Sequence, residues 1–334
     1  MMRRIKTLVL LAIPVFGFQA VNWHLPYPES WPKPEYDYIA TPLDSAKIAL
    51  GRQLFYDPLL SRDSTISCES CHSPFSAFTH VDHALSHGID DRIGTRNAPA
   101  LFNLAWHKNF MWDGLASTLR HQNQMPISHP DEMDMDMDEL ILRLRNETKY
   151  KKLFYEAFGD STAQEMPMLE ALSQFQLSLI SANSKYDQMK AGKAIFSPIE
   201  EKGYNLYKQL CSACHTEPLF STYDYADNGL TIDTALHDIG HVVASWDEKD
   251  SFAFKIPSLR NVEYSFPYMH DGRFATLYQV LDHYANHQPI RPNVDSRIQR
   301  NKPLSPDQKT ELLAFLLTLS DSSFIFDRSH WAPR

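Results

Sequence analysis

The sequence predicts a mainly α-helical protein built from two tandem copies of one unit, with long loops and little sheet. Three observations carry this prediction: an internal repeat, apolar residues at helical spacing in six segments, and few alternating runs rich in valine or isoleucine. The 334 residues suffice for two hydrophobic cores, and 43% hydrophobic and 22% charged residues are ordinary for a globular protein.

The N-terminal residues have the pattern of an export signal. Arg3, Arg4 and Lys6 precede an uncharged stretch that ends near Ala20 and is short for a membrane span. We therefore expect residues 1–20 to be a signal peptide, with an uncleaved anchor as the alternative. The net charge of −9 argues against nucleic acid as a partner.

Apolar residues three and four positions apart predict the helices. They span residues 46–56, 139–158, 169–181, 199–210, 277–285 and 307–319. Ser305 before Pro306 is a typical start signal for the last of them. The stretches between contain Pro, Gly, Asp and His and are predicted to be loops. Alternating Met and Asp residues in 131–138 predict a solvated turn followed by a helix start.

An internal repeat divides the chain. Residues 97–119 align with residues 255–277 without gaps, at an offset of 158. The identical pairs are Pro99/Pro257, Leu101/Leu259, Asn103/Asn261, Met111/Met269, Asp113/Asp271, Gly114/Gly272, Thr118/Thr276 and Leu119/Leu277. A second, shorter repeat matches Gly51-x-x-Leu54-Phe55 to Gly203-x-x-Leu206-Tyr207. We therefore predict two domains from one ancestral unit, residues 41–188 and 189–325, with the junction near 186–197.

Each predicted domain contains one Cys-x-x-Cys-His motif, and together the two motifs use all four cysteines of the chain. This motif is typical of covalent c-type haem attachment. On a helix, residues three and four apart share a face, so both thiols can reach one porphyrin while the histidine binds its iron. We expect two c-type haems, held by Cys68, Cys71 and His72 and by Cys211, Cys214 and His215.

Other roles for these cysteines fit less well. A four-cysteine zinc site would place its pairs roughly 15–20 residues apart, whereas these pairs lie in opposite halves of the chain. A thioredoxin-like pair needs no histidine after it. Export agrees with haem attachment, because bacteria attach c-type haem outside the cytoplasm, so we expect a periplasmic protein.

Several longer motifs are similar to those of a known family. They are Leu50-Gly51-Arg52-Gln53-Leu54-Phe55-Tyr56-Asp57, Ile66-Ser67-Cys68-Glu69-Ser70-Cys71-His72, Arg96-Asn97-Ala98-Pro99, Trp112-Asp113-Gly114, Pro257-Ser258-Leu259-Arg260-Asn261 and Pro267-Tyr268-Met269-His270-Asp271-Gly272-Arg273-Phe274. From about Thr41 to Asp321, the chain resembles the bacterial dihaem cytochrome c peroxidases and their MauG-like relatives. The resemblance implies two cytochrome-c-like helical domains that meet at an interface between the haems.

The resemblance also assigns residues to peroxide chemistry. It implies that Gln122 and Glu132 lie over the first haem, where they move a proton between the peroxide oxygens and stabilise the leaving hydroxide. It places the family's interhaem tryptophan at Trp112, whose repeat partner is His270. Without the resemblance, Trp112 would be a core aromatic, and the other two would be ordinary surface residues of a helix and a loop.

The resemblance implies a calcium ion at the domain interface. Asn97 would offer its side-chain oxygen, and Ser265 and Pro267 would offer their backbone carbonyls, which are the hard oxygen ligands that Ca²⁺ prefers. The family has threonine at the position of Ser265. The alternative is that Asn97 only caps a turn.

The chain departs from the family pattern on both haems and at Leu115, where the family usually has arginine. The position of the distal histidine of the first haem falls on Ile89, so His87 is the candidate ligand, or else a solvated loop histidine. The position of the second haem's methionine ligand falls on Tyr284, where MauG-like enzymes use tyrosine. A phenolate ligand lowers the haem potential, and the histidines at positions 283 and 287 are its rivals.

Three functions remain open. The first is an exported peroxidase that reduces hydrogen peroxide to water with electrons from a small cytochrome c or cupredoxin, and the negative charge suits a basic redox partner. The second is a MauG-like oxidase that withdraws electrons from aromatic residues of a partner protein. The third is an electron-transfer protein without catalysis. The family often forms homodimers, although the sequence contains no self-association motif.

Overall fold

The computed structural model describes residues 27–37, 40–286, 291–298 and 303–333. The predicted signal peptide lies outside them. Within these residues the protein is mainly helical, with twelve α-helices and one two-stranded sheet, which confirms the predicted fold class. No helix in the described part of the chain is long and apolar enough to cross a membrane.

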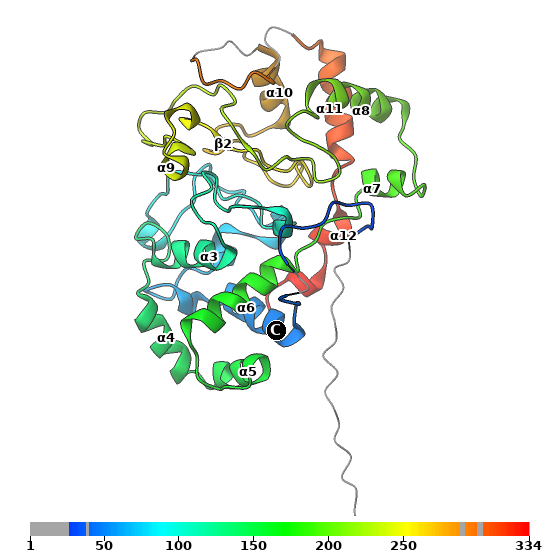
Figure 1. Cartoon of the computed structure of the whole chain (residues 1–334). Helices are drawn as coiled ribbons and strands as arrows, with labels where there is room; N and C mark the ends of the chain where they lie inside the picture. The colour runs from blue at the N-terminus through cyan, green and yellow to red at the C-terminus, as the bar shows by residue number, and fades with distance from the viewer. Residues whose placement is uncertain (1–26, 38–39, 287–290, 299–302, 334) are drawn as a thin grey trace, which may run out of the picture.

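The helices fall into two groups along the chain. The first half contains α1 (Ser45–Phe55), α2 (Cys68–Cys71), α3 (Leu119–Ser128), α4 (Met137–Asn146), α5 (Thr148–Phe158) and α6 (Glu165–Leu177). The second contains α7 (Lys185–Lys190), α8 (Pro198–Leu210), α9 (Val242–Ser245), α10 (Leu277–Asn286), α11 (Pro306–Leu317) and α12 (Ser322–Ile325). Strand β1 (Tyr225–Ala226) pairs antiparallel with β2 (Phe254–Lys255). Figure 1 shows α3 to α6 in one body of the molecule and α8, α10 and α11 in another.

Each body has its own hydrophobic core. The core of the first half is centred on α1 and α6, with Leu50 and Phe175 fully or almost fully buried. The core of the second half is centred on α8 and α11, with Tyr207 and Phe315 fully buried. Burial of apolar surface is the main driving force for folding, so two cores agree with two folding units.

Two segments cross the predicted boundary at residue 189. Tyr186 precedes this boundary but packs in the core of the second half. In the opposite direction, α12 returns to the first half, where the Phe324 ring lies 6.1 Å from that of Phe78. Figure 1 shows this red C-terminal segment beside the blue and green elements of the first half. The division at residue 189 therefore stays a prediction.

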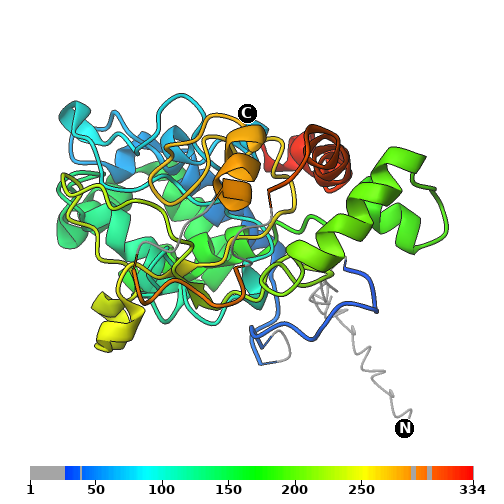
Figure 2. The ribbon, with the colours of Figure 1, turned by 90° about the horizontal axis from the view of Figure 1, so that it is seen from above.

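The duplication is visible in the two main helix pairs. Helix α1 packs on α6, and α8 packs on α11. A Cβ atom at Gly51 would lie 1.9 Å from the backbone oxygen of Ala171, and one at Gly203 would lie 1.9 Å from that of Glu311. Both crossings therefore require glycine, because any side chain would overlap the facing helix. Figure 2 shows α8 and α11 side by side at one edge of the molecule and α9, in yellow, at another.

The loops repeat as well as the helices. In the loop 110–116 the backbone nitrogen of Phe110 donates to the carbonyl of Ala116 at 2.7 Å. In the loop 268–274 the backbone nitrogen of Tyr268 donates to the carbonyl of Phe274, also at 2.7 Å. Within these loops Met111 and Met269 have positive φ angles of 68° and 76°. Such angles are uncommon for residues other than glycine, so their recurrence indicates a shared ancestor rather than chance.

Four predicted helices correspond to α1, α8, α10 and α11 within two residues at each end. The predicted helix 139–158 is instead two helices, because Glu147 is extended, with φ −85° and ψ 118°, and lets α5 turn to pack on α1. The predicted helix 169–181 begins earlier and ends at Leu177. Its early start includes Pro167, which the first helical turn tolerates because the N–H groups there have no helical partner.

The Met-Asp segment differs from its prediction in part. Asp136 caps the start of α4, as predicted, by accepting a hydrogen bond of 2.9 Å from the backbone of Glu139. However, Met133 and Met135 are only 3% and 2% exposed and belong to the first core. The turn is therefore not solvated on both sides, since its methionines bury against the helices that surround it.

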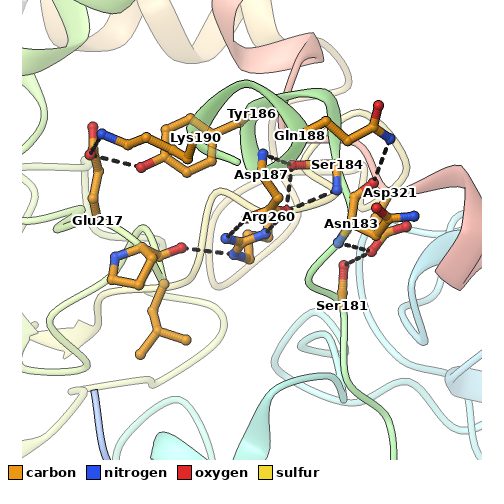
Figure 3. Close-up of polar contacts among 12 residues, drawn as sticks. Ser181, Asn183, Ser184, Tyr186, Asp187, Gln188, Lys190, Glu217, Arg260 and Asp321 are labelled. Carbon is orange, nitrogen blue, oxygen red and sulfur yellow. Dashed lines mark hydrogen bonds and ion pairs between the residues drawn. The ribbon is translucent and has the colours of Figure 1, made fainter. Parts of the chain in front are cut away.

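A buried polar cluster joins the two halves (Figure 3). Arg260 is fully buried and donates to both carboxylate oxygens of Asp187, at 2.8 and 2.7 Å. Nearby, Asp321 accepts hydrogen bonds from the backbone of Asn183 at 2.8 Å and from the hydroxyl of Ser181 at 3.1 Å. Helix α7 is thus fixed to Arg260 of the second repeat, and the segment between α6 and α7 is fixed to Asp321 near the C-terminus.

Candidate functional site

One cavity of about 700 Å³ is lined by residues of both halves and by both Cys-x-x-Cys-His motifs. Cys71 and His72 of the first motif contribute to its wall, as do Cys211, Cys214 and His215 of the second. All four cysteines are free thiols, and burial raises their pKa values. The structure therefore brings together the residues that the sequence places 143 positions apart.

The first motif forms α2 and the residue after it. The backbone nitrogen of His72 donates to the carbonyl of Cys68 at 2.9 Å, which holds the five residues in one helical turn. The Nδ1 atom of His72 lies 2.8 Å from the carbonyl of Phe78. Because a carbonyl can only accept, Nδ1 carries the proton and Nε2 keeps its lone pair for a metal. Burial lowers the pKa of His72 to about 4, so the ring is neutral.

The second motif reproduces this arrangement in turns that follow α8, rather than on a helix. The backbone nitrogen of His215 donates to the carbonyl of Cys211 at 2.9 Å. The Nδ1 atom of His215 lies 3.2 Å from the carbonyl of Phe220 and 3.1 Å from that of Pro257. Burial lowers its pKa to about 4, so this ring too presents a neutral Nε2.

Gln122 and Glu132 both line the cavity, and Glu132 lies close enough to Cys68 and Cys71 of the first motif to help raise the pKa of their thiols. Gln122 comes from α3, and its side-chain oxygen is buried without a hydrogen-bond partner among the described residues. Glu132 lies in the loop before α4, and burial raises the pKa of its carboxyl. A buried amide oxygen without a partner is costly, so this atom indicates that a donor belongs in the cavity.

The structure does not bring His87 into the cavity wall. Its Nδ1 lies 3.0 Å from the carboxylate of Asp91, and its ring stacks on His83 with centroids 4.1 Å apart. Ser86, next to it, does line the cavity. Ile89, at the family's distal position, is fully buried and lies outside the wall. Neither side chain belongs to the cavity wall, and ligation of the first iron by His87 stays a prediction.

Trp112 and His270 both line the cavity, as their pairing in the repeat suggested. The Trp112 indole nitrogen donates to the carbonyl of Asn97 at 2.8 Å, and the Asn97 backbone nitrogen donates to the carbonyl of His270 at 2.7 Å. The His270 ring stacks on Phe254, with centroids 3.7 Å apart. The Asn97 carbonyl therefore fixes the indole of Trp112, and the His270 carbonyl in turn holds the Asn97 backbone.

The predicted calcium ligands Asn97, Ser265 and Pro267 also line the cavity. The side-chain nitrogen of Asn97 donates to the carbonyl of Ala84 at 2.9 Å. This hydrogen bond fixes the orientation of the Asn97 amide and is neither for nor against a metal ion there. Among the described residues, no group of three or more His, Cys, Asp or Glu side chains could hold a metal ion. The calcium site, which uses an amide and carbonyls instead, stays a prediction.

Tyr284 lies on α10 and lines the cavity, and burial raises its pKa to about 12. Its neighbour His283 has a different partner, because its Nε2 lies 3.0 Å from the carbonyl of Asn228. The other rival, His287, lies outside the described residues. Of the candidate ligands on the described part of α10, only the tyrosine belongs to the cavity wall.

The wall also contains basic residues to which the sequence assigned no role, among them Lys255 and Arg96. Lys255 is 7% exposed and Arg96 binds Asp113 at 2.6 Å and Asp238 at 2.7 Å. The repeat contained a signal for Lys255, since it aligns with Asn97. The sequence does not indicate the partners of Arg96, because Asp113 and Asp238 lie 17 and 142 positions from it along the chain.

The wall fits a haem in each half. Paired thiols stand beside a neutral imidazole in both motifs, and the cavity that they share contains a buried amide oxygen without a partner. Thiols suit covalent attachment, and a histidine whose second nitrogen is hydrogen-bonded suits an iron ligand. A duplicated helical fold around such a cavity defines the class of dihaem proteins.

Comparisons with known proteins agree. A family model described as di-haem cytochrome c peroxidase matches residues 45–195. The methylamine utilization protein MauG of Methylorubrum extorquens is 36% identical over 304 residues, which cover 87% of this chain and 82% of that protein. The cytochrome c551 peroxidase of Nitrosomonas europaea is 31% identical over 285 residues, which cover 84% and 81%. The crystal structure of a MauG-like protein associated with microbial copper homeostasis has a TM-score of 0.84 at 29% identity, covering 93% of this chain and 99% of that one.

The chain belongs to the di-haem cytochrome c peroxidase family, whose members include both peroxidases and MauG proteins. Membership of this family supports two bound haems and an oxidoreductase activity. It leaves open which of the two activities this chain has, because relatives with each name cover most of it at similar identity.

Proposed function

We propose that the protein is an exported, periplasmic dihaem peroxidase that reduces hydrogen peroxide to water, with electrons from a small redox protein such as cytochrome c or a cupredoxin. One observation carries this proposal: the unpartnered oxygen of Gln122 and the protonatable carboxyl of Glu132 share the cavity wall with His72. An electron-transfer protein would have no use for a buried acid and an unpaired acceptor beside its haem.

The reaction consumes one peroxide, two electrons and two protons, breaks the O–O bond and releases two waters. When bound, the first haem supplies an iron that can take an oxygen ligand and exchange electrons. The Gln122 side-chain oxygen accepts a hydrogen bond from a peroxide O–H and orients the substrate. Glu132 holds a proton at its raised pKa and gives it to the departing oxygen, so that water rather than hydroxide leaves.

The other residues of the wall have supporting roles. Cys68, Cys71, Cys211 and Cys214 would form the thioether bonds, and His72 and His215 would bind the two irons. Trp112 would carry electrons between the halves, since its indole is fixed by the carbonyl of Asn97. Asn97, Ser265 and Pro267 would bind one Ca²⁺ through oxygen atoms.

A matched pair of glutamate variants tests the proposal. The purified holoprotein should oxidise reduced cytochrome c or a reduced cupredoxin when peroxide is added. Glu132→Gln should lower the turnover by about 10²–10⁴-fold, which is the usual contribution of a positioned acid or base. Glu139→Gln, an identical change at an exposed residue of α4, should leave the turnover unchanged. Equal turnover in the two variants would remove Glu132 from the reaction.

Tyr284 favours a second candidate, a MauG-like oxidase that withdraws electrons from aromatic residues of a partner protein. A tyrosine ligand would lower the potential of the second haem, so ordinary cytochrome c would be a poor donor. An oxidase of this kind should respond to peroxide with a rapid change of its haem spectrum but turn over little cytochrome c. No spectral response at all would indicate the third alternative, electron transfer without catalysis.

A further inference from the structure

A buried lysine that forms no ion pair with a carboxylate of the described residues lines the cavity between the halves. Lys255 lies in β2, opposite Tyr225, and its backbone nitrogen donates to the carbonyl of Trp112 at 2.8 Å. Its Nζ donates to the backbone carbonyl of Asn109, a neutral group. Burial lowers the pKa of Lys255 to about 7, so an ammonium is expensive at this place.

The arginines of the wall differ from Lys255 in their ion pairs. Each has a carboxylate partner within the described residues: Arg96 with Asp113 at 2.6 Å, Arg260 with Asp187 at 2.7 Å and Arg297 with Asp295 at 2.7 Å. Asp113 attracts Lys255 from a longer distance, but it is already bound by Arg96. Lys255 is therefore the cation of this described wall that still lacks an anion.

Apart from the more distant Asp113, the described residues around Lys255 supply no carboxylate. The Phe110 ring lies 5.9 Å from Nζ. The ring of His107 is neutral, because burial and the charge of Lys255 hold its pKa well below the ordinary value. The His107 ring packs on Tyr223, with centroids 4.0 Å apart. A buried lysine among aromatic and neutral groups is a place for an anion that the described part of the chain does not supply.

We propose that the Nζ of Lys255 binds a propionate carboxylate of the haem that is attached to the second motif. A haem carries two propionates, and a buried carboxylate needs a cation as much as this lysine needs an anion. We choose the second haem because the backbone near Lys255 contacts the histidine of the second motif. The carbonyl of Pro257, two residues after Lys255, accepts a hydrogen bond from the ring of His215 at 3.1 Å. The inference rests on the two haem sites and not on peroxide as the substrate.

The reduction potentials of the two haems test this role without any turnover. Lys255→Gln removes the charge and keeps a hydrogen-bonding side chain, whereas Lys255→Arg keeps the charge. At a fixed solution potential, Lys255→Gln should lower the ratio of reduced to oxidised second haem about tenfold, or 59 mV for one electron. A unit charge about 10 Å from a redox centre, at an effective dielectric constant of about 20, has roughly this effect.

The controls separate this role from a general loss of charge. Lys255→Arg should stay close to the wild-type ratio. Lys208→Gln, an exposed lysine on α8 three residues before Cys211, should also have no effect, because solvent screens its charge. An unchanged second haem in Lys255→Gln, or a change confined to the first haem, would overturn the proposal. Turnover with peroxide does not enter these measurements, so failure here is distinct from failure of the proposed peroxidase.

A measurement on the unmodified holoprotein covers the case in which the glutamine variant does not mature. The propionate bending bands in the resonance Raman spectrum respond to hydrogen-bond donors. On transfer from H₂O to D₂O, the band of the second haem should shift in the wild type, and Lys255→Arg should move it further because a guanidinium donates differently from an ammonium. Bands that respond to neither change would contradict a lysine–propionate contact.

Discussion

The buried ion pair between Arg260 and Asp187 makes a prediction about how the second half is held together. The guanidinium of Arg260 faces the carboxylate of Asp187 (Figure 3). The Arg260 side chain is 0% exposed, and that of Asp187 is 8% exposed. Asp187→Asn removes the negative charge at almost constant volume and leaves the guanidinium buried without a counterion. Its other neighbours, the rings of Trp31 and Phe220 and a backbone carbonyl, carry no net charge to replace the carboxylate.

The magnitude follows from burial. Removing one partner of a buried pair costs about 3–5 kcal/mol, whereas an exposed pair is worth about 0–1 kcal/mol. For domains of this size, this cost corresponds to a decrease of about 6–20 °C in the melting temperature. Thermal unfolding of the holoprotein, followed by circular dichroism, measures the decrease. Lys152→Met breaks an exposed pair with Glu156 one helical turn away, which is worth about 0.3–0.5 kcal/mol, so it should change the melting temperature by less than about 2 °C.

A double variant isolates the buried charge as the cause. Arg260→Met combined with Asp187→Leu removes both charges together, so most of the lost stability should return. A melting temperature of Asp187→Asn within about 2 °C of the wild type would refute the reasoning. A double variant as unstable as the single one would instead assign the loss to the cap that Asp187 forms with Ser184.

The helix crossing, the cavity tyrosine and the buried glutamate make three further predictions. Gly203→Ala should lower the free energy of unfolding by about 1–3 kcal/mol in a denaturant titration, because its methyl group would lie 1.9 Å from the Glu311 backbone oxygen. Asn205→Ala, exposed on the same helix, should change it by no more than about 0.5 kcal/mol. Tyr284→Phe should alter the absorption spectrum of the oxidised second haem, and an unaltered spectrum would exclude ligation. Since burial raises the pKa of Glu132, turnover should fall as the pH rises through that value, and Glu132→Gln should abolish this limb of the pH profile.

Predictions that depend on neighbours in sequence agree well with the structure. The four helices α1, α8, α10 and α11 have the predicted bounds within two residues, because each needs only an apolar face at helical spacing and a start signal such as Ser305. The two Cys-x-x-Cys-His motifs each close one turn by a hydrogen bond from histidine to the first cysteine. The repeat at an offset of 158 indicated the duplication that the glycines 51 and 203 show in space.

Predictions that depend on distant contacts fared differently. Met133 and Met135 alternate with aspartates as surface residues do, yet the first core buries them. Helix α3 was not predicted, because its His, Gln and Asn residues interrupt the helical spacing of apolar residues. This helix nevertheless places Gln122 on the cavity wall. The resemblance to a family suggested Gln122, Glu132 and Tyr284 as site residues, and these positions do lie on the cavity wall, whereas His87 does not.

The sequence by itself determined the helical class, the duplication and the two attachment motifs, because each is written in residues that lie within a few positions of one another or at a constant offset. Only the tertiary structure decided that both motifs share one cavity, that His87 turns to Asp91 and that Lys255 is buried without an ion pair among the described residues. Burial and the loss of a charge partner are properties of contacts between distant segments, which local spacing does not record.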